Sequence, residues 1–277
     1  MKHMKQRHTR FTALCLALLL TACGSGTAPF PETRELHVFA AASLQEALDA
    51  VIQDYRIATP EVTVTVTYDS SGTLLQQIKA GAPCDLFLSA APKQMDALDG
   101  SLAGDAEKNP DGLDLIVEGS RIDLLENRIV LAVPEGNPAG IESFDQLALL
   151  LKKGEVLLAV GNRDVPVGQY TRSIFSYYGI DEAAVTSCLT YGSNAREVTT
   201  QVCESTVDCG ILYATDAFSA GLTVVEEAAA DLCGQVLYPA AVLSCGSQPE
   251  AAQAFLDHLR SGDAGIHFEA VGFSPLT

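Results

Sequence analysis

Residues 36–68, LHVFAAASLQEALDAVIQDYRIATPEVTVTVTY, decide the fold. Residues 36–40 form a short apolar run typical of a buried strand, and the apolar residues from Leu44 to Tyr55 recur at helical spacing. In residues 62–68 valine alternates with threonine up to Tyr68, a pattern that predicts a second strand. Short strands that alternate with helices of ten to fifteen residues indicate parallel sheets covered on both faces, so we expect an α/β fold.

The same alternation continues to the end of the chain. It yields too many elements for one sheet of ordinary size, so we expect two α/β lobes, mostly parallel, with helices on both faces of each sheet. Lobe I is predicted to comprise residues 35–121 and 240–277, and lobe II residues 122–239. Residues 100–120 are rich in Gly, Asp and Asn. This composition is compatible with a surface loop and with an insertion that contains a short helix. The further strands are predicted at 85–89, 128–133, 156–160, 207–213, 222–225 and 236–243, and the further helices at 73–79, from 92, 143–153, 166–178, 195–204, 249–260 and 264–271.

Composition and charge exclude several classes of protein. The chain has 277 residues, of which 48% are apolar and 19% charged, which is typical of a globular protein and not of a disordered one. The formal net charge of −18 argues against nucleic acid and anionic membrane surfaces as partners. It also argues at first against a small anion. However, surface carboxylates beyond about 8 Å are largely screened at physiological salt, so converging hydrogen-bond donors can outweigh them.

The first residues have the pattern of an export signal. Residues 1–10 carry four basic side chains and no acid, residues 11–20 are apolar, and Leu20-Thr21-Ala22-Cys23 follows. We expect residues 1–22 to be a lipoprotein signal peptide, Cys23 to be lipidated, and residues 23–34 to be a tether. The protein would then be exported and lipid-anchored to the outer face of the cell membrane, with a net charge of −22. The alternative is an ordinary signal peptide with a coincidental cysteine.

The remaining cysteines and histidines do not form a recognisable reactive site. No C-x-x-C and no histidine cluster is present, so a zinc or redox site is not expected. Free thiols are slightly favoured, although export would permit disulfides. No hydrolase, nucleotide-binding or zinc-protease motif occurs either, so we expect no catalysis, no cofactor and no metal-cation site. The six cysteines that follow residue 23 are Cys84, Cys188, Cys203, Cys209, Cys233 and Cys245.

Small or hydroxyl residues recur where strands lead into helices. Ser43 and Glu46 have the spacing of a capping box, and residues 70–73 (SSGT) open the next helix, with a glycine that allows close backbone approach. Residues 165–168 (VPVG) and 193–197 (SNARE) open two more. Each of these patterns, taken alone, more often indicates a residue that only caps a helix than one that binds a ligand. Together they predict an anion site, because free N–H groups gather at the carboxyl ends of parallel strands.

Several of these motifs resemble, in the same order, those of the molybdate-binding proteins of bacterial molybdate ABC transporters. The resemblance covers nearly the whole mature chain and implies a two-lobed periplasmic-binding-protein-like fold of type II, with the ligand in the interlobe cleft. It also implies that binding closes the hinge. The motifs are VFAAASL (38–44), SSGTL (70–74), GAPCDLFLSA (81–90), VPVGQY (165–170), GILY (210–213) and VGF (271–273).

The resemblance implies which residues bind the oxyanion. The hydroxyl groups are those of Ser43, Ser71 and Tyr213, and the backbone N–H groups are those of Val167 and Ala195. Val167 stands where the family often has alanine, and Cys84 where it has a small apolar residue. Tyr170 is expected to pack and not to bind.

The resemblance also implies a function and leaves alternatives. We expect a monomeric solute-binding lipoprotein that carries molybdate or tungstate to an ABC permease and its ATPase. Sulfate, thiosulfate or a small organic acid is the alternative, and an organic acid would recruit Arg196. Phosphate carries a proton that needs an acceptor, which Asp69 could offer. An exported hydrolase is less expected, because no nucleophile–histidine pair is evident.

Overall fold

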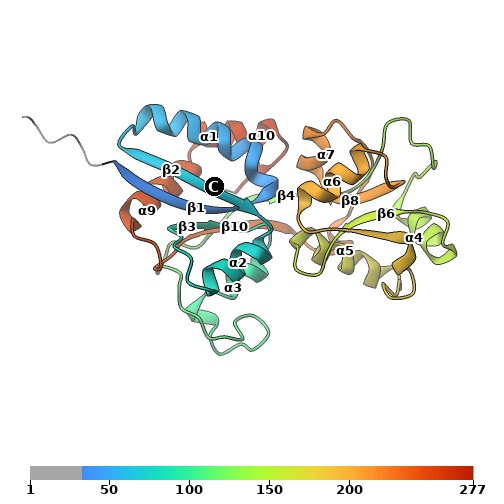
Figure 1. Cartoon of the computed structure of the whole chain (residues 1–277), viewed down its shortest axis with the longest axis horizontal. Coiled ribbons are helices and arrows are strands. Elements are labelled where there is room, and N and C mark those ends of the chain that lie inside the picture. The colour runs from blue at the N-terminus through green and yellow to red at the C-terminus, as the bar shows by residue number, and fades with distance from the viewer. Residues whose placement is uncertain (1–32, 277) are drawn as a thin grey trace, which may run out of the picture. The chain divides into compact units, whose positions relative to one another are not determined.

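The computed structural model describes residues 33–276, which form two α/β lobes, each built on one sheet (Figure 1). The predicted signal peptide, Cys23 and the tether up to Glu32 lie outside the described residues. Within residues 33–276, no helix has both the length and the apolar character needed to cross a membrane.

The first sheet has six strands in the order β11-β4-β10-β3-β1-β2. Strand β1 pairs in parallel with β2 and β3, whereas β10, β4 and β11 extend the sheet through antiparallel pairs. The strands are β1 (Arg34–Ala41), β2 (Val62–Asp69), β3 (Leu86–Leu88), β4 (Ile122–Asn127), β10 (Val236–Val242) and β11 (Ser274–Pro275). The helices of this lobe are η1 (Ala42–Leu44), α1 (Gln45–Ala58), α2 (Ser71–Lys79), α3 (Pro92–Asp96), η2 (Gly100–Leu102), α9 (Pro249–Leu259) and α10 (Gly262–Ala270).

Both faces of the inner strands β1 and β3 are buried near their carboxyl ends, as the apolar runs predict, whereas one face of the edge strand β2 is exposed. On β1, Val38 and Ala40 belong to the apolar core that includes α1, α9 and α10, whereas Phe39 belongs to a smaller core with α2 and α3. The alternation follows from the two-residue period of a strand. Helices on both faces therefore hold the carboxyl ends of β1, β2 and β3 in fixed positions.

The second sheet has five strands in the order β7-β6-β8-β5-β9. Strand β6 pairs in parallel with β7 and β8, and β5 pairs antiparallel with β8 and β9. The strands are β5 (Ile129–Val133), β6 (Leu158–Gly161), β7 (Leu189–Gly192), β8 (Cys209–Tyr213) and β9 (Thr223–Glu227). The helices are α4 (Phe144–Lys153), α5 (Pro166–Tyr177), η3 (Thr186–Cys188), α6 (Ala195–Cys203), α7 (Ala214–Ser219) and α8 (Ala230–Cys233).

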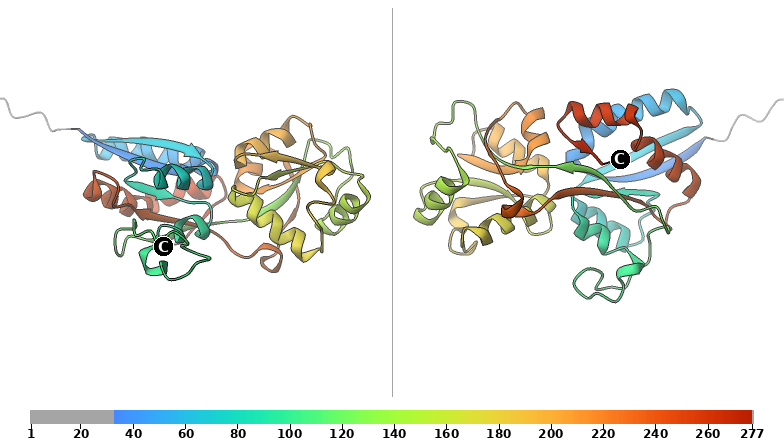
Figure 2. Two further views of the ribbon diagram at one scale, coloured as in Figure 1. Left: turned by 60° about the horizontal axis from the view of Figure 1, so that its bottom comes forward. Right: turned by 180° about the vertical axis from the view of Figure 1, so that it is seen from behind.

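Two crossover segments join the lobes, one after β4 and one before β10 (Figure 2). The lobe boundaries predicted after Arg121 and before Ala240 are wrong in detail. Both cut into the first sheet, because β4 and the whole of β10 pair within it. The chain therefore leaves the first sheet after Asn127 and returns to it at Val236.

The segment 100–120 combines both of the expected possibilities. It contains the short helix η2 and is otherwise irregular. The buried Asn109 organises it: its side chain donates to the carbonyl groups of Asp99 and Leu113 and accepts the N–H of Leu113. All six cysteines of the described residues are free thiols.

Candidate functional site

A small cavity lies between the two lobes, at the carboxyl ends of their parallel strands. The first lobe contributes residues that follow β1, β2 and β3, and the second lobe contributes residues that follow β6, β7 and β8. This is the edge at which ligands bind in open α/β sheets. The lining residues with polar groups or at helix starts are Ser43, Asp69, Ser70, Ser71, Val165, Pro166, Ala195 and Tyr213.

Ser43 lines the cavity, but the capping box predicted for it is wrong. Ser43 lies inside the 3₁₀ turn η1, and the N-cap of α1 is Leu44, which makes no side-chain cap. The Ser43 hydroxyl is instead 2.9 Å from the hydroxyl of Tyr238 on β10. The 3₁₀ turn thus turns this side chain away from the helix start and toward the crossover strand.

The side chains of the two serines at the start of α2 make different hydrogen bonds. Ser70 is the N-cap, and its Oγ accepts the N–H of Thr73 at 3.1 Å. Ser71 is completely buried, and its Oγ accepts the N–H of Ala90 at 2.9 Å. This N–H uses one of the two lone pairs of the Ser71 oxygen, and the hydroxyl proton, which this bond does not use, is available for another group.

The second lobe directs two helix N-termini at the cavity. Helix α5 begins with Pro166 at its first position, and the Asn194 side chain caps α6 by accepting the N–H of Glu197 at 3.0 Å, as predicted. Ala195 lines the cavity, whereas Val167 is fully buried behind the lining residue Pro166. First-turn N–H groups have no partner within their helix and carry partial positive charge. The two starts therefore suit an anion.

Tyr213 ends β8 with its side chain buried between the lobes. Its hydroxyl donates to the carbonyl oxygen of Ala90 at 3.4 Å, and its ring packs edge-on against those of Tyr170 and Tyr238. Burial raises the pKa of Tyr213 well above its usual value, so this hydroxyl stays protonated and remains a donor. Tyr170 packs on this aromatic cluster and is not among the lining residues.

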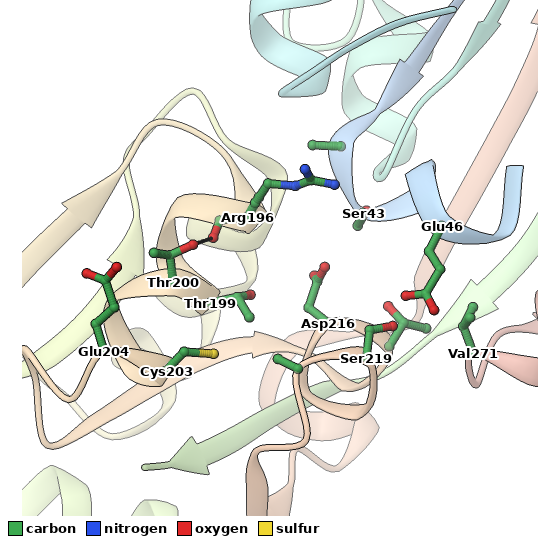
Figure 3. A pocket seen from close by; sticks show the side chains of 13 residues that line it. Ser43, Glu46, Arg196, Thr199, Thr200, Cys203, Glu204, Asp216, Ser219 and Val271 are labelled. Carbon is green, nitrogen blue, oxygen red and sulfur yellow. Dashed lines mark hydrogen bonds between the residues drawn. The ribbon is translucent and has the colours of Figure 1, made fainter. Parts of the chain in front are cut away.

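A second pocket borders the cavity and shares Ser43 with it (Figure 3). Arg196 lines this pocket and donates to the Gln45 side chain across the lobes at 2.6 Å. It does not line the small cavity, where an organic acid would have required it. Asp216 points into the pocket (Figure 3), and its buried Oδ2 has no hydrogen-bond partner within residues 33–276.

Asp216 is a site residue that sequence reasoning missed, since its position after Tyr213 suggests only a helical surface. Burial raises its pKa from 3.8 to about 7, against the opposing effect of Arg196. The folded protein therefore holds this proton between about pH 4 and 7, where the unfolded chain releases it. Its stability falls as the pH rises through that range.

We expect Asp216→Asn to remove this loss of stability. The amide has no proton to release, so the variant should exceed the wild type by about 1–2 kcal/mol in free energy of unfolding at pH 8, after allowance for solvent contact. The advantage should vanish near pH 4. Urea unfolding at pH 4, 6 and 8 measures it, with the exposed Asp231→Asn as control. A difference that is constant with pH would contradict the prediction.

Comparison with known proteins assigns the family. The family model described as bacterial extracellular solute-binding protein matches residues 36–274. The chain belongs to the bacterial extracellular solute-binding proteins. This solute-binding protein is 31% identical over 278 residues to a Bacillus subtilis (strain 168) protein, with 98% of this chain and 99% of the relative covered. That relative is named provisionally as an ABC transporter substrate-binding lipoprotein.

Two further relatives carry molybdate in their names. The molybdate-binding protein ModA of Haemophilus influenzae is 31% identical over 274 residues, with 96% of this chain and 98% of that protein covered. The periplasmic molybdate-binding protein of Azotobacter vinelandii superposes with a TM-score of 0.72 at 18% identity, with 87% of this chain and all of that chain covered. The second likeness confirms the two-lobed α/β fold. The family match assigns this chain the role of a solute-binding protein.

Proposed function

We propose that the protein captures molybdate, or the near-isosteric tungstate, in the interlobe cavity and delivers it to an ABC permease and its ATPase. The observation that carries the proposal is the convergence of hydrogen-bond donors from both lobes on this small cavity. A tetrahedral dianion offers only acceptors, and donors on every side suit it.

Each proposed contact has a structural basis. The hydroxyls of Ser43 and Ser71 donate to the oxyanion, as do the backbone N–H groups of Val167 and Ala195 at the starts of α5 and α6. The Tyr213 hydroxyl donates to it in place of its 3.4 Å contact with the carbonyl oxygen of Ala90. Pro166, which precedes Val167, lines the cavity, so the first turn of α5 faces the ligand. The larger side chain of valine is compatible with this role because the contact uses only the backbone.

The cellular location is part of the same proposal. Export by residues 1–22 and lipidation of Cys23 anchor the mature monomer to the outer face of the cell membrane. The tether gives the lobes reach to the permease. The lipoprotein name of the Bacillus subtilis relative supports this arrangement.

The net charge of −18 is compatible with an anionic ligand. Screening weakens repulsion by distant surface carboxylates, and each charge-assisted hydrogen bond in the cavity contributes about 1.5–3 kcal/mol. Asp69 is the one carboxylate that lines the cavity within the described residues, and its Oδ1 accepts the N–H of Ser70 at 2.6 Å.

Asp69 supports a second candidate ligand. A carboxylate at the cavity can accept the proton of hydrogen phosphate, which the backbone N–H groups cannot do. Hydrogen phosphate therefore belongs in the panel of anions beside sulfate and thiosulfate.

Thermal unfolding of the purified protein with each oxyanion tests the proposal. We expect molybdate and tungstate, present at 100 times their Kd, to stabilise the protein by about 2.7 kcal/mol, because only the folded state binds them. Sulfate and hydrogen phosphate at the same concentrations should stabilise it less. A shift with one of these anions and none with molybdate would reject the assignment.

A further inference from the structure

A chain of hydrogen bonds, buried except at its end on Ser43, runs from the second lobe through both crossover strands to Ser43. Asn127, the last residue of β4, donates through Nδ2 to Thr215 Oγ1 at 3.0 Å and to the Tyr238 hydroxyl at 3.2 Å. The Tyr238 hydroxyl in turn lies 2.9 Å from Ser43 Oγ. Asn127 and Tyr238 are almost completely buried, so water does not compete for these groups.

The directions of these hydrogen bonds follow from one fixed donor. The backbone N–H of Arg128 donates to Asn127 Oδ1 at 2.8 Å, and a backbone N–H can only donate. The amide oxygen is therefore the acceptor, and both protons of Nδ2 are directed to Thr215 and Tyr238. Tyr238 accepts one of them, so its own single proton is free for Ser43. Burial keeps that hydroxyl protonated, since it raises the pKa of Tyr238 well above its usual value.

These hydrogen bonds affect which cavity groups can donate to a ligand. If Tyr238 donates to Ser43 Oγ, one lone pair of the Ser43 oxygen is occupied and its proton is directed away from Tyr238. Ser71 is held in the same way by the N–H of Ala90 at 2.9 Å. Both cavity serines thus accept from the protein and can donate to a ligand.

We infer that Tyr238 and Asn127 are positioning residues that hold the Ser43 hydroxyl as a donor toward the bound oxyanion. The inference rests on the proposed function, because it needs an oxyanion in the cavity. Neither residue lines the cavity, so both act through Ser43. The chain also connects the site of the ligand to the two crossover strands that join the lobes.

A double-mutant cycle tests the inference. Molybdate affinity is measured by calorimetry for the wild type, Tyr238→Phe, Ser43→Ala and the double variant; if the wild type prefers another oxyanion of the panel, that anion is used. We expect Tyr238→Phe to weaken binding 5- to 10-fold alone and less than 2-fold in the Ser43→Ala background. Equal losses in both backgrounds, or no loss alone, would overturn the inference while leaving the proposed function intact. A wild type that binds no oxyanion would overturn both.

The selectivity between molybdate and hydrogen phosphate distinguishes a positioning role of Tyr238 from a merely structural one. In Tyr238→Phe the Ser43 oxygen loses a hydrogen-bond donor and its proton is no longer held toward the cavity, so it accepts a proton from hydrogen phosphate more readily and the ratio of molybdate to phosphate affinity should fall. Asn127→Asp should cause the same change, because a carboxylate draws the Tyr238 proton away from Ser43. An unchanged ratio in both variants would count against the inference.

Tyr170→Phe is the matched control. Its buried hydroxyl has no partner within residues 33–276, and its ring lies 6.4 Å from that of Tyr213. The same loss of a phenolic oxygen there should leave affinity and selectivity within 2-fold of the wild type. Thermal unfolding of every variant verifies that it is folded. A loss at Tyr170 as large as that at Tyr238 would contradict the inference.

Discussion

Gly72→Ala is expected to lower the affinity for the oxyanion by about 100-fold, which corresponds to about 2.7 kcal/mol. Gly72 is the second residue of α2 in the first lobe. A Cβ atom at this position would overlap the backbone carbonyl of Asp164 in the second lobe. A backbone group cannot swing aside as a side-chain end can, so the lobes would have to separate. The cavity between them would then lose donors on one side.

Gly262→Ala provides the matched control for this result. Gly262 also lies at a helix start, as the first residue of α10, and a Cβ there meets no atom within 4 Å. We expect its affinity to equal that of the wild type. Calorimetry gives the affinities and small-angle scattering with saturating molybdate gives the degree of closure. A Gly72→Ala variant that binds and closes normally would show that the lobes do not need this contact.

Ser71→Ala is expected to weaken oxyanion binding by 10- to 100-fold. The change removes a hydroxyl donor in the cavity, which is worth about 1.5–3 kcal/mol when the acceptor is charged. It also leaves the buried N–H of Ala90 without its 2.9 Å acceptor, so a loss of stability of about 1–3 kcal/mol should accompany it. Affinity and thermal unfolding are both measured.

The neighbouring Ser70→Ala separates binding from helix capping. The Ser70 hydroxyl is engaged with the N–H of Thr73 at the helix start. We expect this variant to lose about 1 kcal/mol of stability and to retain affinity within 3-fold. If Ser70→Ala lost more affinity than Ser71→Ala, the assignment of the second serine would be reversed.

The helix starts show how far local sequence predicts structure. Pro166 at the first position of α5 and the Asn194 cap of α6 are confirmed, because a missing N–H or a side-chain cap acts within a few residues of the chain. The close approach at Gly72 is also confirmed, although the sequence could not identify Asp164 as its neighbour. The Ser43 capping box failed because a contact with Tyr238, far away in the chain, competes for the same hydroxyl.

Strands that form through long-range pairing could not be predicted from the local sequence pattern. Strand β4 reads IDLLEN, which lacks a clear two-residue alternation, and it forms because β10 and β11 flank it on both sides. The lobe boundaries shifted for the same reason. Asn127 and Tyr238 sit on these crossover strands, so no local motif could have marked them as members of the site.

Local sequence sufficed to predict the α/β class, the starts of α5 and α6, and the resemblance on which the proposed ligand depends. These depend on periodicity, capping and motif order, all of which act over short distances along the chain. The hydrogen-bond partners of the polar groups near the cavity could be identified only from the tertiary structure. Ser43 is bonded to Tyr238, Ser71 to Ala90 and Arg196 to Gln45, whereas Asp216 Oδ2 has no partner within residues 33–276. The physical reason is that hydrogen-bond direction and burial depend on atoms that are distant in sequence and meet only when the lobes fold.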